Sequence, residues 1–184
     1  MLYGGTAFGY TQKPDFFHVS RNLDFWQKVI DKFYSKYNRL AQWHNELVRE
    51  VQRTGRLVMP TGREFVFESK IINGEHKWPR TKILNYPVQG TGADLVAIGR
   101  VTMWKRIKKS GLTGLFISTV HDSIDLDVSN DIVYNIGKIV RQSILDIPIN
   151  FYRLFGHKFN LPINCEIGYG PNLKELVPFE NHSH

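Results

Sequence analysis

The segment from Ser20 to Arg53 limits the folds available to this chain more than any other feature of the sequence. Its apolar residues recur at steps of three and four, which is the period of an amphipathic helix. Neither glycine nor proline occurs within it, and Gly55 follows where a helix C-terminus commonly has glycine. We therefore expect one long helix, or two in succession, over these residues.

The next part of the chain changes from short strand-like runs to a second helical pattern. Leu57 to Met59 and Glu64 to Phe67 flank a Pro-Thr-Gly turn and predict a hairpin. Residues 71–80 predict a polar, basic loop. A helix is then expected to begin between positions 91 and 94 and to end at Gly111. Its expected buried residues are Leu95, Ile98, Val101, Met103 and Ile107.

The C-terminal part of the sequence predicts a strand-turn-strand unit, a helix and a last strand. Residues 113–120 and 124–128 are the two strands, and His121 to Ser123 form the turn. Ser129 or Asn130 is expected to cap the helix that follows, and residues 163–170 form the last strand. This order favours an α+β fold, with helices packed on a small antiparallel sheet, over a parallel βαβ winding.

Composition gives weaker constraints than pattern. Lys and Arg total 24 against 17 Asp and Glu, a net charge of +7, and a basic balance favours a polyanionic partner such as nucleic acid. Composition alone, however, favours a protein that is merely basic. Cys165 is the single cysteine, so neither an intrachain disulfide nor a cysteine-based zinc site is expected. No apolar run approaches the ~20 residues of a membrane span, and we expect a cytoplasmic protein (in the host cytoplasm if it is phage-encoded).

The predicted turn of the C-terminal hairpin contains the pair His121 and Asp122. A carboxylate at a hairpin tip is exposed on a rigid support, which suits an oxygen-liganded cation such as Mg²⁺. Sites with two metal ions, however, normally take carboxylates from different segments. The alternative is a polar Asx turn in which Asp122 accepts backbone N–H groups. This stretch alone favours the alternative.

Five segments, in order along the chain, change that balance because together they resemble one family. They are LYGGTAFGY (2–10), TGREFVF (61–67), NYPVQGTGADL (85–95), VHDSI (120–124) and CEIGYGPNLKEL (165–176). Each is similar to a motif of the family A (DNA polymerase I-like) DNA polymerases. The first is similar to the end of motif B, the second to a Gly-Arg hairpin, the third to the Asn-x-Pro-x-Gln-Gly-Thr motif, and the fourth to motif C. The last is similar to the closing strand.

The resemblance implies a division of the chain and a catalytic centre. Residues 1–57 would be the rear helices of the fingers, and residues 58–184 a partial palm with the helix of the Gln motif and the motif C hairpin. Asp122 would be a palm carboxylate that binds Mg²⁺, and His121 a donor near the primer-terminal phosphate. In such a site two Mg²⁺ ions neutralise the triphosphate and activate the primer 3′-hydroxyl.

The resemblance also implies residues that contact primer-template DNA. Gln89 and Asn85 would donate to minor-groove acceptors, which occur on every base pair, although for Asn85 a capping network before a helix remains an alternative. Tyr3 would stack beside the templating base, or be a loose aromatic residue near the N-terminus. Arg63 would reach a phosphate or the palm, or face solvent. Arg80 lies one position away from the family's arginine and ranks below the others.

The sequence departs from the family pattern at several points. It contains no match to motif A, which carries the family's second metal-binding Asp, nor to the triphosphate-binding start of motif B. Ser123 stands where the family has Glu, and Leu173 where it often has Trp. We therefore expect an inactive isolated chain that needs an N-terminal polymerase polypeptide carrying motif A, besides DNA and deoxynucleoside triphosphates, and that self-associates through an exposed palm surface. Met1 is either the start of one subunit of a split, phage-type polymerase or the boundary of a segment of a longer chain.

Two other functions are compatible with the same residues. The first is a non-catalytic, basic DNA-binding module, which predicts salt-dependent duplex affinity without chemistry. The second is a single-metal nuclease that uses Asp122 and His121. The nuclease is the less favoured of the two because it leaves the other four motifs unexplained.

Overall fold

The computed structural model describes residues 4–179, and Tyr3 lies outside the described residues. The N-terminal elements are α1 (Ala7–Gln12), a 3₁₀ turn (Pro14–Phe16), α2 (Leu23–Lys36), α3 (Asn38–Thr54), β1 (Arg56–Val58), β2 (Glu64–Val66), β3 (Lys70–Ile72) and β4 (Glu75–Lys77). Next come α4 (Arg80–Lys109), β5 (Gly114–Val120), β6 (Ser123–Val128), a 3₁₀ turn (Asn130–Ile132), α5 (Val133–Leu145), α6 (Ile147–Phe155), β7 (Gly168–Tyr169) and β8 (Val177–Pro178). The α+β prediction is confirmed. The expected single sheet is instead four antiparallel pairs of strands within the described residues: β1–β2, β3–β4, β5–β6 and β7–β8.

The chain forms two compact units that divide at Thr91 and Gly92, inside the continuous helix α4. The predicted division at residue 57 follows the roles of family motifs rather than compactness, and it stays a prediction. Among the described residues, no helix is long and apolar enough to cross a membrane.

The first unit contains the long helical segment, which is two helices. Tyr37 (φ −113°, ψ 59°) separates α2 from α3. The hydroxyl of Tyr34 on α2 lies 3.1 Å from Nδ1 of the fully buried His44 on α3. Helix α3 ends at Thr54 and is capped by Gly55, whose φ of 73° is in the left-handed region that glycine adopts without strain. The core beside this end consists of Val51, Leu57, Phe67 and Ile83, so it joins α3, the β1–β2 hairpin and the start of α4.

Two predictions for residues 71–94 are wrong. Residues 70–77 form the β3–β4 hairpin rather than a loop, with Asn73 (φ 54°) and Gly74 (φ 80°) at its turn. Helix α4 begins at Arg80 instead of near Thr91, and it contains Pro87. Proline removes one helical hydrogen bond, but Ile83 and Leu84 in the preceding turn are fully buried. Their burial holds the helix together across the proline.

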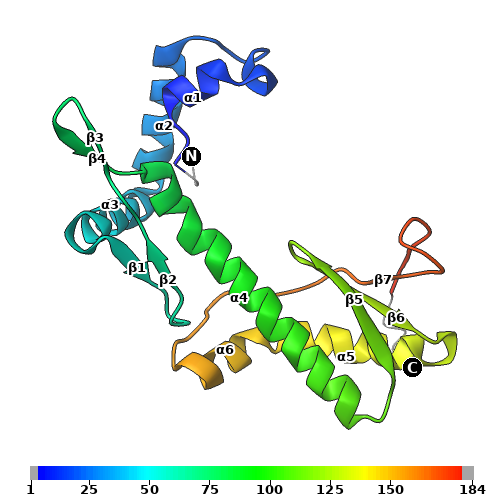
Figure 1. The fold of residues 1–184 in the computed structure, drawn as a ribbon. Coiled ribbons are helices and arrows are strands. Elements are labelled where there is room, and N and C mark those ends of the chain that lie inside the picture. Colours follow the sequence, from blue (N-terminus) through cyan, green and yellow to red (C-terminus); the bar gives the residue numbers. More distant parts are fainter. Residues whose placement is uncertain (1–3, 180–184) are drawn as a thin grey trace. The chain divides into compact units, whose positions relative to one another are not determined.

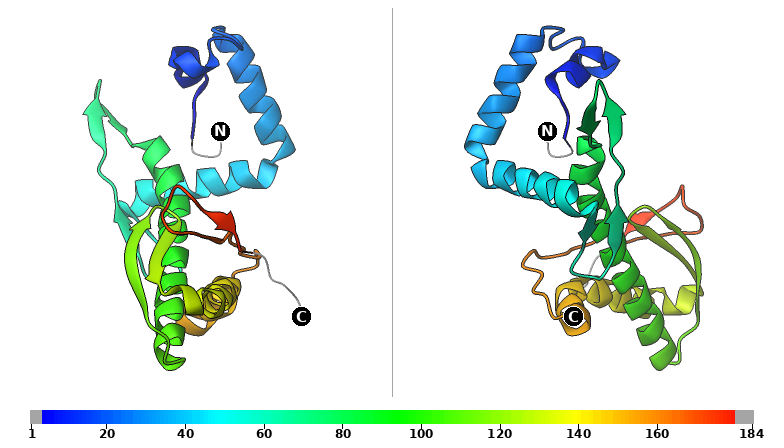
Figure 2. Two further views of the ribbon diagram at one scale, coloured as in Figure 1. Left: turned by 90° about the vertical axis from the view of Figure 1, so that its right-hand side faces the viewer. Right: turned by 60° about the vertical axis from the view of Figure 1, so that its left-hand side comes forward.

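The second unit packs α5 and α6 against the C-terminal half of α4. Its core consists of Ile98, Ile147 and Phe151. The β5–β6 hairpin lies beside the same half of α4 in all three views (Figures 1 and 2). Two details differ from expectation. Val101 on α4, predicted to be buried, is 46% exposed, and the last strand is limited to Gly168–Tyr169, which pairs with β8.

Candidate active site

The tip of the β5–β6 hairpin presents His121 and Asp122. Val120 pairs with Ser123, so the turn between the strands has two residues, as the sequence predicted to within one position. The Ser123 hydroxyl donates a hydrogen bond of 3.1 Å to the carbonyl of Val120, which fastens the turn. Both tip side chains are exposed. The carboxylate of Asp122 is therefore presented to solvent by a short, hydrogen-bonded turn.

His121 adopts a backbone conformation that is uncommon for residues other than glycine. Its φ is 54°, in the left-handed region, and among the described non-glycine residues it shares a positive φ with Asn73 alone. A tight two-residue hairpin turn requires positive φ and favours Gly or Asn, so a histidine here is strained by about 1–2 kcal/mol. Residues held in such conformations cluster at functional sites, which supports a role for the imidazole.

The hairpin by itself does not complete a metal site. Asp125 accepts a hydrogen bond from the Ser118 hydroxyl across the two strands, so its carboxylate is already engaged. Asp127 is exposed but lies opposite Leu115, several residues from the tip. Over residues 4–179, no three His, Cys, Asp or Glu side chains come together in a group that could hold a metal ion. The oxygen donor of Asp122 suits Mg²⁺, but the number of ligands is too small.

In the first unit, the structure brings Arg63 beside the Gln-Gly step of α4. Gly90 is buried against the β1–β2 hairpin, because a Cβ at this position would lie 2.5 Å from Cζ of Phe65 and 3.2 Å from Cδ of Arg63. The absence of a side chain at Gly90 therefore allows the close approach of the hairpin. The neighbouring Gln89 is exposed. Gln89 and Arg63 are therefore both exposed, and they come from different elements that meet at Gly90.

Asn85 lies inside helix α4 and not in a capping turn before a helix. It lies in the second turn of α4, which begins at Arg80, so the alternative of a cap before the helix does not fit. Its Oδ1 is buried, and among residues 4–179 no donor reaches it. An unsatisfied buried acceptor costs about 1–3 kcal/mol, and groups kept at such a cost commonly serve a function. Arg80, at the start of the same helix, donates to Asn45 Oδ1 at 3.4 Å.

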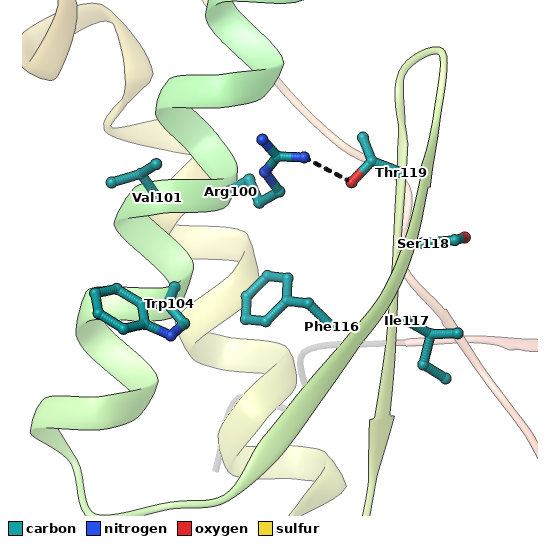
Figure 3. Close-up of a pocket in the computed structure, with 7 residues that line it drawn as sticks. All are labelled: Arg100, Val101, Trp104, Phe116, Ile117, Ser118 and Thr119. Carbon is teal, nitrogen blue, oxygen red and sulfur yellow. Dashed lines mark hydrogen bonds between the residues drawn. The ribbon is translucent and has the colours of Figure 1, made fainter.

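Sequence analysis missed two features of the second unit. Arg106, near the end of α4, donates a hydrogen bond to Asp146 at the junction of α5 and α6. This hydrogen bond is the main reason why the pKa of the Asp146 carboxyl lies below its usual value. The second feature is a pocket of about 480 Å³ between α4 and β5 (Figure 3). Sequence analysis did not predict this pocket, because Val101, which lines it, was expected to be buried.

Comparison with solved structures identifies the architecture. The polymerase domain of Pol1 from M. smegmatis, solved as a complex with DNA primer-template and dNTP, matches with a TM-score of 0.72. The match covers 89% of this chain and 27% of that chain, at 16% sequence identity. The fold is therefore that of part of a DNA polymerase domain.

Comparison of sequences then gives the family. The profile of DNA polymerase family A matches residues 1–175, and the chain belongs to this family. It is 23% identical to DNA polymerase I of Chloroflexus aurantiacus over 179 residues, and 24% identical to the DNA polymerase of Bacillus phage SP01 over 176 residues. These matches cover 97% and 94% of this chain but only 18% and 19% of the relatives. The resemblance inferred from the five motifs is confirmed.

Proposed function

We propose that this chain supplies the motif C side of a DNA-directed DNA polymerase site, and that a segment outside these 184 residues supplies the second metal-binding carboxylate. The observation that carries the proposal is the position of Asp122, a solvent-facing carboxylate on a hydrogen-bonded hairpin tip in a chain of DNA polymerase family A. The need for an outside carboxylate is supported by residues 4–179, in which no three His, Cys, Asp or Glu side chains form a group that could hold a metal ion.

The residues of this chain have separate roles in the proposed site. Asp122 offers a carboxylate oxygen to Mg²⁺, which when bound neutralises the triphosphate and makes the primer 3′-hydroxyl more acidic. The imidazole of His121, exposed beside it, donates to the primer-terminal phosphate. Gln89 and Asn85 donate to the minor groove, where acceptors are common to all base pairs, and Arg63 holds a backbone phosphate. Tyr3 and Arg80 are weaker candidates for template contacts.

Primer extension with Mg²⁺ and all four deoxynucleoside triphosphates tests the proposal. The chain alone and its Asp122→Ala variant are both expected to be inactive. Addition of a polypeptide that carries motif A is expected to give extension with the parent chain. The variant should then be slower by more than about 100-fold, because loss of even an indirect metal-site contact costs 10–100-fold. Extension by the parent chain alone, with loss in the variant, would refute the need for an outside carboxylate. Asp125, Asp127 or a second copy of the chain would then have to supply it.

A second candidate function is a non-catalytic DNA-binding module. The net charge of +7 and the incomplete metal group favour it. It predicts duplex binding whose affinity falls steeply with salt, and no extension after a motif A polypeptide is added. Normal duplex affinity in the Asp122→Ala variant is expected for both functions, so the extension assay separates them.

A further inference from the structure

Strand β5 contains one extra residue on its way to the hairpin tip. Phe116 and Ser118 pair with adjacent residues of β6, so Ile117 between them is a β-bulge. In a regular strand Phe116 and Thr119, which are three positions apart, would lie on opposite faces of the sheet. After the bulge both side chains point toward α4, whereas Ile117 points away from it (Figure 3). The bulge therefore turns Thr119 to the helix.

Thr119 uses this orientation to contact α4 through a hydrogen bond. Arg100 Nη1 on α4 donates to Thr119 Oγ1 at a distance of 3.3 Å (Figure 3). Thr119 is the neighbour of Val120, which pairs with Ser123 to close the turn. The hydrogen bond therefore reaches the hairpin beside its tip, three residues before Asp122.

The root of the hairpin is held to α4 in a different way, by apolar packing. A Cβ at Gly114, the first residue of β5, would lie 3.2 Å from Cγ1 of Val128 and 4.0 Å from Cγ2 of Ile107 on α4. Ile107 is buried, and it lies about two helical turns after Arg100. The hairpin is thus attached to α4 at two levels. The attachment nearer the tip is the hydrogen bond between exposed Arg100 and exposed Thr119.

The two attachments differ in what they do for the tip. A two-stranded hairpin is marginally stable in water, and its tip opens locally more easily than its packed root. Bulges that turn a side chain to a new partner are common beside active sites. We propose that Arg100 is a positioning residue, which acts through Thr119 to hold the tip so that Asp122 presents its carboxylate to Mg²⁺ in one orientation. This inference rests on the proposed function of Asp122.

Hydrogen exchange in the chain alone, without DNA, nucleotide or Mg²⁺, tests the contact itself. Thr119→Val keeps the branched shape of the side chain and removes the hydroxyl, and Arg100→Met removes the guanidinium. Each should speed exchange of the amide hydrogens of residues 120–123 by about threefold, the effect of one exposed hydrogen bond. Thr119→Ser keeps the hydroxyl and should restore exchange close to that of the parent. Thr113→Val is the matched control, because Thr113 is exposed at the root of the hairpin.

A double variant separates the hydrogen bond from a direct effect of the Arg100 charge. Thr119→Val should change tip exchange no further when Arg100→Met is already present, because both substitutions remove the same bond. If the charge acted directly on the tip, the two effects would add. Urea unfolding should give nearly the same midpoint for the parent and each single variant, because the contact is local.

Primer extension with the added motif A polypeptide tests the consequence for the metal. Thr119→Val should need about threefold more Mg²⁺ than the parent for its half-maximal rate, because metal binding must also order the tip. At saturating Mg²⁺ the rates of the two should be nearly equal. A merely structural role, by contrast, would lower the rate by the same factor at every Mg²⁺ concentration.

Three results would overturn the inference: unchanged tip exchange in Thr119→Val, additive effects in the double variant, or an unchanged Mg²⁺ dependence of extension. Faster and non-additive tip exchange, in a parent chain that does not extend primers with the motif A polypeptide, would support the positioning of the tip. The same result would refute the proposed function.

Discussion

Two glycines of α4, Gly90 and Gly92, are two positions apart, and we expect alanine to change the free energy of unfolding differently at them. A Cβ at Gly92 would meet no atom within 4 Å. Gly92→Ala should therefore raise the free energy of unfolding by about 1 kcal/mol, the difference in helix propensity between the two residues. A Cβ at Gly90 would lie 2.5 Å from Cζ of Phe65, the end of a rigid ring in the β1–β2 hairpin.

The two effects at Gly90 oppose each other. Alanine gains the same ~1 kcal/mol of helix propensity, but displacement of a packed ring costs about 1–3 kcal/mol. Gly90→Ala should therefore range from nearly neutral to about 2 kcal/mol destabilising. The difference between the changes in unfolding free energy of the two variants cancels the helix propensity and leaves the packing cost at Gly90. Urea unfolding, monitored by circular dichroism, measures both. Equal stabilisation by the two substitutions would refute the close packing of α4 on Phe65. A Cβ at Gly90 would displace Arg63 as well as Phe65. Gly90→Ala should therefore also weaken duplex binding relative to Gly92→Ala.

Two further predictions concern polar side chains. The pKa of the Asp146 carboxyl is lowered in the folded chain, chiefly by the hydrogen bond from Arg106. The contact therefore stabilises the fold fully at pH values above the pKa of the unfolded chain, about 4, and this stabilisation is lost as the pH falls through the lower pKa of the folded chain. Asp146→Asn should thus lower the free energy of unfolding by about 1 kcal/mol at pH 7. Below about pH 4 the urea midpoints of the variant and the parent should converge. An equal difference between the midpoints at both pH values would exclude this contact as the cause. Asn85→Leu should raise the free energy of unfolding by about 1 kcal/mol, because it removes a buried acceptor without a donor. It should also weaken primer-template binding in a fluorescence anisotropy titration, and unchanged affinity would argue against a DNA contact by Asn85.

The elements that were predicted correctly are those fixed by short-range signals. The β5–β6 hairpin follows from β-branched runs on either side of a polar turn, and the end of α3 follows from Gly55. The β3–β4 hairpin had such a signal, the Asn73-Gly74 pair that favours a tight hairpin turn, but the charged residues around it suggested a loop. The start of α4 had one local signal, Pro79, whose carbonyl accepts a hydrogen bond from the Ile83 N–H. Pro87 favours a break, and only the burial of Ile83 and Leu84 against distant segments overrides it.

The candidate site divides in the same way. The position of Asp122 at a turn is local information, so sequence predicted it, and the family motif supplied its expected role. The pocket around Trp104 was not predictable, because helical periodicity shows that a face is apolar without showing what covers it. Val101 was expected in the core on that basis and is 46% exposed. An apolar position with the correct helical period can therefore still be exposed.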